Sequence, residues 1–298
     1  MNAGSPDLAA YARAVAPHVD RLAIAVHKHV RPAGRALVQE FGLRHPGVLV
    51  DARATLLAGP IALDDLAAIE RYVPRDELAA ALEEHVGQGL LTHEVGAGGR
   101  YVATPRGRDF LRRLTAAQGE TITALWAARA AALPVLVATA TRAADHAAAI
   151  LPRAAYPAFH GQDAAPDPAG ATPAHLLLTR LTTLRYLRAD AHAAAWRSRG
   201  LDAAQGAVFT ALWRARTPLT TDEARGLVSN GDAADRVLET LHERGLTAQE
   251  AGGWRISAAG RALRDAIERD TDRGAAPPFV TLAPPERTAF LTGLERLA

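Results

Sequence analysis

The chain has 298 residues, of which 49% are hydrophobic and 22% are charged, with a formal net charge of +2 and no cysteine. These figures are typical of a folded globular protein and exclude a disulfide-stapled scaffold, a zinc-thiolate site and a long disordered tail. The small charge also excludes a protein that coats nucleic acid by charge alone, so any DNA contact requires a local basic patch. The length predicts two domains of roughly 150 residues each.

Nothing in the sequence predicts a targeting or membrane segment. The N-terminal residues lack the basic start and apolar run of a signal peptide. The most apolar stretch, residues 124–140, is interrupted by Arg129 and Pro134. It is also shorter than the roughly 18 uncharged residues that a spanning helix needs. We therefore expect a cytoplasmic protein with no membrane partner.

Helical periodicity and glycine punctuation predict a series of helices in the first half of the chain. A long helix over residues 19–40 ends at Gly42, a position suited to the left-handed residue that closes many helices. Shorter helices are predicted over residues 50–58, 62–71 and 75–86. Two short extended runs around the glycine-rich tip at residues 97–99 predict a β-hairpin. A further helix begins at Pro105, and residues 112–150 predict long alanine-rich helices.

The segment 152–173 contains five prolines and two glycines, which predicts a linker. We therefore expect a first unit over residues 1–150, a linker over 151–175 and a second unit over 176–298. In the second unit, helices are predicted over residues 176–197, 203–215, 220–227 and 233–244. A hairpin with its tip at residues 251–253 follows, then a helix from residue 258, and C-terminal helices over 261–272 and 285–297.

The two halves carry the same landmarks in the same order, which indicates an internal duplication. The landmark spacings are 158 residues for Gly42 and Gly200, 156 for Gly89 and Gly245, and 153 for Gly107 and Gly260. Changes in loop length explain a drift of this size over a block of roughly 65 residues. Each half therefore has the order helix, helix, short helix, turn, helix, hairpin, helix. This is the order of a winged helix-turn-helix.

The second unit resembles a MarR-type winged helix-turn-helix protein. The resemblance lies in LRYLRADAHAAAWRSRGLDAAQGAVFTAL, LTTDEA and ADRVLETLHERGLTAQEAGGWRISAAGRAL. In the first unit, ALEEHVGQGLLTHEVGAGGRYVATPRGRDFL carries a looser resemblance. The phrase LRYLRADAH, together with Thr271 and Asp272, is similar to an actinobacterial tandem helix-turn-helix family. MarR proteins are symmetric dimers, so the resemblance implies a mainly α, pseudo-dimeric chain that is a monomer or a homodimer in solution.

The resemblance also implies a function, namely a ligand-responsive, DNA-binding transcriptional regulator with double-stranded DNA as a partner. The ligand would be a small aromatic or anionic molecule in the cleft between the interface helices and the DNA-binding lobe. The residues expected to contact DNA are Arg75, Arg100, Arg106, Arg236 and Arg255.

The electrostatics of the two predicted recognition helices oppose this function. Residues 74–87 carry one arginine and four carboxylates, a balance of 1 − 4 = −3. Residues 230–244 carry two arginines and four carboxylates, a balance of 2 − 4 = −2. Carboxylates that face phosphates oppose the counterion release that supplies most of the affinity for DNA.

Polar residues on the first helix of each unit predict the ligand site, with arginines to clamp an anion and His192 as an acid or base near neutral pH. Alignment of the Gly-Leu landmarks places His27 opposite Arg185. The alternative is that these side chains make ordinary surface contacts. The residues predicted to bind the ligand are His27, Arg31, Arg185, Arg188, His192 and Trp196.

The sequence predicts no cofactor and no metal site. It contains no nucleophile elbow, phosphate loop, dinucleotide fingerprint or zinc-binding HExxH motif, so no catalytic residue is identified. His27 and His29 point apart on a helix and are poorly placed to share a metal ion. The alternative to a regulator is therefore a protein that reuses the winged-helix fold without binding DNA. Such a protein would bind or transform a small molecule in the interhelical cleft.

Overall fold

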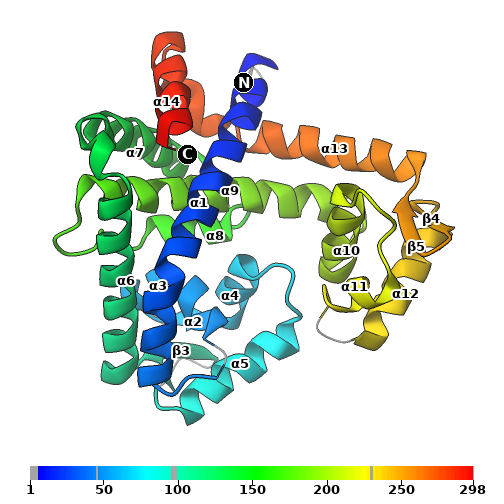
Figure 1. The fold of residues 1–298 in the computed structure, drawn as a ribbon, viewed down its shortest axis with the longest axis horizontal. Coiled ribbons are helices and arrows are strands. Elements are labelled where there is room, and N and C mark those ends of the chain that lie inside the picture. Colours follow the sequence, from blue (N-terminus) through cyan, green and yellow to red (C-terminus); the bar gives the residue numbers. More distant parts are fainter. Residues whose placement is uncertain (1–5, 45, 95–98, 229–230, 298) are drawn as a thin grey trace.

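The computed structural model shows a mainly helical chain, which confirms the mainly α character predicted from the sequence. It describes residues 6–44, 46–94, 99–228 and 231–297. Figure 1 shows a set of long helices and two groups of shorter elements, one group in each half of the chain. Of the predicted hairpin tip at 97–99, residues 97 and 98 lie outside the described residues.

The first half of the chain consists of two long helices with short helices and a small sheet between them. In chain order these are α1 (Pro6–Glu40), α2 (Gly47–Asp51), α3 (Arg53–Ala58), β1 (Ile61–Ala62), α4 (Leu63–Ile69), α5 (Arg75–Gly87), β2 (Leu91–His93), β3 (Arg100–Ala103) and α6 (Pro105–Leu125). The strands are antiparallel in the order β1-β3-β2, with Ile61 opposite Tyr101. The sheet therefore ties the start of α4 to the hairpin.

Helix α1 is longer than the sequence predicts. It begins at Pro6 and continues through Pro17 and Pro32, so the expected start at residue 19 is wrong. The added turns bury Ala12 and Val15 among helices from the second half of the chain. Burial of this apolar face outweighs the local preference of proline for a helix end.

The middle of the chain forms η1 (Ala127–Ala132), α7 (Leu133–Ile150) and α8 (Pro157–Asp163). Helix α8 lies within the proline-rich segment that the sequence predicts as a linker. Phe159 of α8 is fully buried, and its backbone N–H donates to the carboxylate of Asp190 at 2.9 Å. The segment is therefore packed into the molecule, because Phe159 and this hydrogen bond hold it against α9 and α4.

The second half has a similar order of elements, with the single helix α10 where the first half has α2 and α3, and with a bridge in place of the first strand. Its elements are α9 (Pro173–Arg197), α10 (Ala203–Arg214), α11 (Thr221–Arg225), α12 (Gly231–Glu243), β4 (Thr247–Glu250), β5 (Gly253–Ile256), α13 (Ala258–Gly274), η2 (Pro277–Thr281) and α14 (Pro284–Leu297). β4 and β5 pair antiparallel, and Leu219 forms a bridge with Trp254. The bridge occupies the same place in the second half as β1 does in the first.

The start of the helix after each hairpin is built in the same way. Thr104 and Ser257 cap α6 and α13 by accepting from the backbone N–H of Gly107 and Gly260, respectively. A Cβ on Gly107 would overlap the carbonyl oxygen of Leu90, and a Cβ on Gly260 would overlap that of Leu246. Glycine is therefore required at both positions by close approach of the backbone.

The buried side chains of the described residues form three hydrophobic clusters. The central core combines both halves of the chain, including Val19 of α1, Ala143 of α7 and Leu181 of α9. The N-terminal lobe is built around Leu66, Leu82 and Phe110, and the C-terminal lobe around Phe209, Leu238 and Ile267. Each group of short helices therefore has its own core, while the long helices share one.

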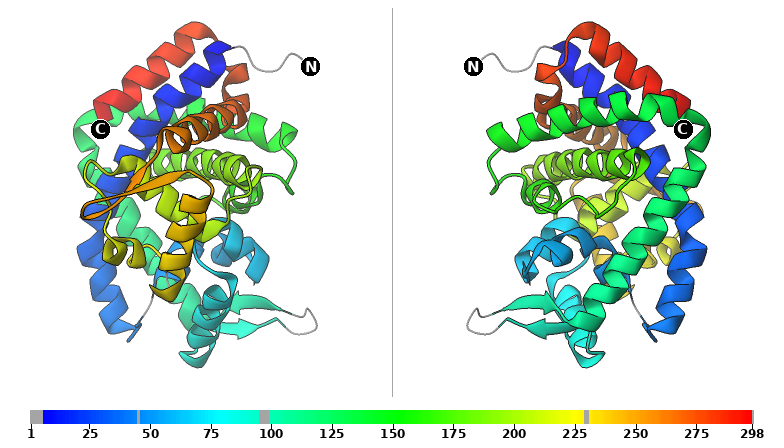
Figure 2. Two further views of the ribbon diagram at one scale, coloured as in Figure 1. Left: turned by 90° about the vertical axis from the view of Figure 1, so that its right-hand side faces the viewer. Right: turned by 90° about the vertical axis from the view of Figure 1, so that its left-hand side faces the viewer.

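The long helices set the positions of the two lobes. In Figure 1, α1 runs beside α6 and α9 runs beside α13, and α1 crosses the second pair. Figure 2 shows that the two hairpins point to opposite sides of the molecule. Both α5 and α12 lie on the side away from α14. Among the described residues no single helix is long and apolar enough to cross a membrane, although α6 and the segment 127–150 reach that length together across an 88° bend.

Candidate functional site

A cavity of about 960 Å³ lies between α3, α6 and the first half of α9. The end of α8 and the following residues 165–170 form another wall. The volume is near the upper end of the roughly 300–1,000 Å³ that small-molecule sites occupy. Because α3 belongs to the N-terminal lobe and the start of α9 to the central core, the cavity lies between these two bodies.

Arg53 places a fixed positive charge at the cavity wall. Its Nη1 donates to the carbonyl oxygen of Val50 at 3.2 Å, and its Nη2 donates to Oε1 of Gln118 on α6. Burial lowers the pKa of Arg53, yet a guanidinium group starts from so high a pKa that it stays charged at neutral pH. The Arg53–Gln118 hydrogen bond links the lobe to the central helices at the cavity itself.

His175 adds a neutral imidazole to the same wall. It follows the N-cap of α9, where the hydroxyl of Thr172 accepts from the His175 backbone N–H at 3.3 Å. The imidazole ring packs against Gly119 of α6, where a Cβ would overlap Nδ1. Burial, and then the charge of Arg53, lower the pKa of His175, so the ring is neutral at physiological pH. A neutral imidazole offers one hydrogen-bond donor and one acceptor.

The rest of the lining consists mainly of alanines, leucines and threonines, and it also includes the charged side chains of Arg112, Glu120 and Asp167. Three of the threonine hydroxyls donate hydrogen bonds to backbone carbonyl oxygens of their own helices. Their oxygen lone pairs therefore remain available as acceptors. These bonds run from Thr115 to Leu111 at 2.8 Å, from Thr179 to His175 at 3.0 Å and from Thr182 to Leu178 at 2.8 Å. The cavity is therefore suited to an apolar molecule with one polar or anionic group near Arg53 and His175.

The structure places the predicted ligand residues outside this cavity. Arg188 forms ion pairs with two carboxylates of α13. Its Nη1 lies 2.7 Å from Asp272 and its Nη2 lies 2.8 Å from Glu268. His192 lies 3.1 Å from the hydroxyl of Thr271 through Nδ1. Burial first, and then neighbouring arginines led by Arg264, lower the pKa of His192 to about 3, so it is neutral across the physiological range.

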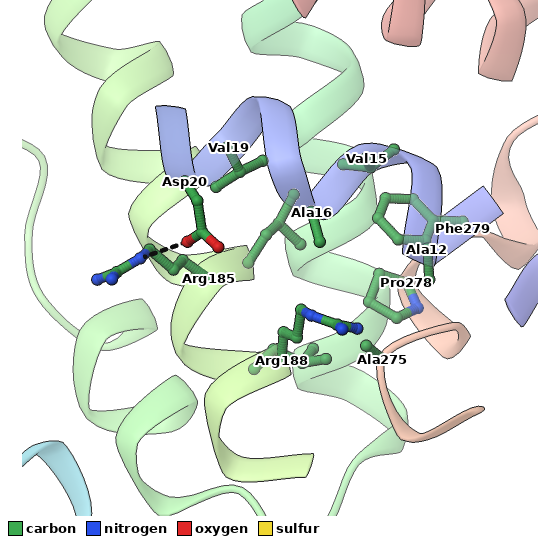
Figure 3. A pocket seen from close by; sticks show the side chains of 12 residues that line it. Ala12, Val15, Ala16, Val19, Asp20, Arg185, Arg188, Ala275, Pro278 and Phe279 are labelled. Atoms are coloured by element: carbon green, nitrogen blue, oxygen red, sulfur yellow. Dashed lines mark hydrogen bonds and ion pairs between the residues drawn. The ribbon is translucent and has the colours of Figure 1, made fainter. Parts of the chain in front are cut away.

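Arg185 lies against α1 at a small cavity. Its Nε donates to Asp20 at 2.9 Å, as Figure 3 shows. The cavity, lined also by Arg188 and Phe279, has a volume of about 30 Å³, enough for roughly one water molecule. His27 and Arg31 are exposed on α1, and the described contacts pair Arg185 with Asp20 and not with His27. The cavity that Arg185 and Arg188 line is therefore too small for an organic ligand.

Four of the five arginines predicted to contact DNA bind other groups of the chain. Arg75 pairs with Asp64, Arg100 lies 3.6 Å from Glu94 and Arg255 lies 2.6 Å from Glu250. Arg106 donates to two backbone carbonyl oxygens, those of Phe41 at 2.8 Å and Gln88 at 2.5 Å. Arg236 is exposed and forms no ion pair with the described residues.

The exposed side of α5 is acidic. Asp76 and Glu83 are exposed, and Glu83 accepts a hydrogen bond from the hydroxyl of Tyr101 at 2.7 Å. Because the only arginine of this helix is paired with Asp64, its surface offers little positive charge to a phosphate backbone. In α12, Asp235 pairs with Arg225 at 2.9 Å, so Arg236 remains the free cation among its described side chains.

Comparison with known proteins gives one match. A family model described as a helix-turn-helix family matches residues 109–298, which is more than half of the chain. The chain therefore belongs to this helix-turn-helix family, a class that indicates a DNA-binding regulator. No curated protein and no solved structure matches it. The matched range includes α10, α11, α12 and the second hairpin but begins after the first hairpin.

Sequence reasoning missed the main lining residues of the large cavity, Arg53, Gln118 and His175. One signal was present, since Gly119 interrupts an otherwise helical pattern and an isolated helix glycine often marks a close approach. No sequence pattern identifies what approaches it, because His175 comes from a helix 56 residues further along the chain. Among the described residues no group of three His, Cys, Asp or Glu side chains is placed to hold a metal ion.

Proposed function

We propose that the chain is a ligand-responsive transcriptional regulator of MarR-like type, with two winged helix-turn-helix units in one polypeptide. In this proposal the first unit spans residues 1–150, the segment 151–175 joins the units, and the second unit spans 176–298. The matching caps at Thr104 and Ser257 support the duplication, as do the matching positive φ angles at Gly42 (65°) and Gly200 (68°).

One observation carries the ligand response: the large cavity has walls from both the N-terminal lobe and the central core. A molecule in the cavity touches α3 and α9 together, so its binding favours one placement of the lobe over others. The positive charge of Arg53 and the apolar lining favour a small aromatic or anionic ligand. Any change in lobe placement also changes the position of α5 and therefore the fit to DNA.

The ligand part of this proposal is tested with aromatic carboxylates, beginning with benzoate. We expect a concentration-dependent rise in Tm for the native chain and none for Thr179→Trp, which fills the cavity. Ala36→Trp, at an exposed position of α1, is the matched control, because it adds the same bulky side chain at the surface. If the aromatic carboxylates raise the Tm of Thr179→Trp as much as that of the native chain, the cavity is not the ligand site.

A second candidate is a small-molecule protein that does not bind DNA. The acidic exposed side of α5 and the pairing of four predicted DNA-contact arginines favour this alternative. Fluorescence anisotropy with labelled fragments of mixed genomic DNA separates the two functions. Binding that weakens steeply between 50 and 200 mM salt supports the regulator. No binding at 50 mM salt supports the alternative.

A further inference from the structure

Tyr72 and Trp196 form a junction between the N-terminal and C-terminal lobes. Tyr72, which follows α4, stacks on Trp196 near the end of α9, with ring centroids 6.4 Å apart and an interplanar angle of 24°. Gly206 of α10 lies against both rings, where a Cβ would be 3.5 Å from each. Arg71 precedes Tyr72 in the chain, so it lies beside this junction, and it is only 8% exposed.

This junction gathers more guanidinium groups than carboxylates. Arg264 of α13 is 2% exposed and lies 4.6 Å over the ring of Trp213. Its carboxylate partner, Glu268, is shared with Arg188, which also binds Asp272. His192 lies 3.9 Å from Glu268 through Nδ1, which places its ring beside Arg188 and Arg264. Burial, and then the charges of four arginines, lower the pKa of His192. Those arginines are Arg264, Arg188, Arg71 and Arg214.

Three buried donors at the junction lack an acceptor. Nη1 of Arg71, Nε of Arg264 and Nε1 of Trp196 have no hydrogen-bond partner among the described residues. Asp190 is the carboxylate whose charge raises the pKa of Arg71 most. It accepts a hydrogen bond from the backbone N–H of Phe159 at 2.9 Å. Buried donors, above all charged ones, are normally paired, because an unpaired group loses its hydration without a replacement.

We propose that the junction between the lobes binds a compact oxyanion, a phosphate or carboxylate group, through Arg71, Arg264 and the indole N–H of Trp196. An oxyanion supplies several acceptor lone pairs and a negative charge, which are the two things that this cluster lacks. Arg71 comes from the N-terminal lobe, and Arg264 and Trp196 from the C-terminal half, so the bound anion joins the two.

Thermal unfolding of the full chain in phosphate, in acetate and in chloride at matched ionic strength tests this site. At 100 times Kd the anion should raise Tm by about 5 °C over chloride. Arg71→Met should abolish the anion-dependent shift. It should not lower Tm in chloride, because methionine removes an unpaired buried charge while keeping an apolar stem. Arg75→Met, at an exposed arginine paired with Asp64, should keep the full shift.

Trp196→Phe gives a second measurement if Arg71→Met proves unstable. It preserves an aromatic ring against Tyr72 and removes the indole donor together with part of the ring, so the apparent Kd for the anion should weaken about tenfold. A response to phosphate alone assigns a phosphate group, and a response to acetate alone assigns a carboxylate. The proposal is overturned if neither anion shifts Tm beyond chloride, or if both variants respond as the native chain does.

Discussion

The carboxylate of Asp272 lies 2.7 Å from Nη1 of Arg188, and the Asp272 side chain is only 1% exposed. Its other oxygen accepts from Nε of Arg13 on α1 at 2.5 Å. One carboxylate on α13 therefore holds a cation from α9 and a cation from α1. The sequence places these residues far apart, and the ion pairs fix the crossing of the three helices.

Asp272→Asn is expected to lower the free energy of unfolding by about 3–5 kcal/mol, because it leaves the charge of Arg188 half-buried and only partly paired. Urea denaturation measures this loss. Asp20→Asn is the control, since Asp20 pairs with Arg185 where both side chains are about half exposed, and it should change stability by less than about 1 kcal/mol. Equal effects of the two variants would contradict a structural role for the buried carboxylate.

Gly119→Ala should destabilise the chain by about 1–3 kcal/mol, because the added methyl overlaps the imidazole of His175. Gly34→Ala is a matched control within α1, where the nearest atom to a Cβ is a methyl of Leu114 at 3.7 Å. That variant should be neutral or slightly stabilising, because alanine favours helix more than glycine does. Thermal or urea unfolding that ranks the two variants in the opposite order would disprove the close packing of α6 on α9.

The raised pKa of Glu70 leads us to expect that the stability of the chain depends on pH. Burial, followed by its hydrogen bond to the carboxylate of Asp51, raises the pKa of Glu70 to about 8. In the unfolded chain the pKa lies near its ordinary value of about 4.3. Between these values the folded chain holds a proton that the unfolded chain releases. The contribution of Glu70 to stability is therefore complete below the lower pKa and is lost as pH rises toward 8 and above.

Unfolding measured from pH 5 to pH 9 checks this direction. In Glu70→Gln the decline attributed to this group should disappear, since the amide does not titrate. Glu239→Gln, at an exposed carboxylate of α12, should keep the decline of the native chain. A Glu70→Gln profile as steep as the native profile would show that another group takes up the proton.

Arg236 is the candidate DNA contact that remains unpaired with the described residues, so Arg236→Ala should weaken binding to all DNA sequences alike. The slope of log K against log salt should fall by about 0.9 if one phosphate contact is lost. Arg75→Ala serves as the comparison, because its guanidinium is already neutralised by Asp64. Anisotropy titrations at several salt concentrations provide both slopes. Identical slopes for the native chain and Arg236→Ala would remove Arg236 from the interface.

Local patterns predicted most of the helices, because caps and glycine stops act within a few residues. Thr172 and Thr220 cap helices close to the predicted starts, and Gly42 and Gly200 both take positive φ angles. Helix α8 within the proline-rich segment was not predicted, because the buried side chain of Phe159 outweighs the turn-forming residues around it. The start of α1 was wrong for the same reason, since contacts with distant helices determine it.

The candidate site was less predictable than the helices. Arg188 and His192 share a helix face as predicted, but Asp272 and Glu268 occupy that face and satisfy Arg188. Helical spacing shows which side chains lie together, and it does not show which carboxylates from α13 reach them. Arg53 and His175 meet across a cavity that depends on how α3, α6 and α9 pack, which is a long-range property of the fold.

Helix α9 is a single uninterrupted rod between two sites. His175 at one end lines the large cavity, and Trp196 near the other end supports the lobe junction. The 21 residues that separate them span about 32 Å at 1.5 Å per residue. A stiff helix cannot tilt at one end without displacing the other. A ligand in the cavity and an anion at the junction, both proposed above, would therefore contact the same rigid element.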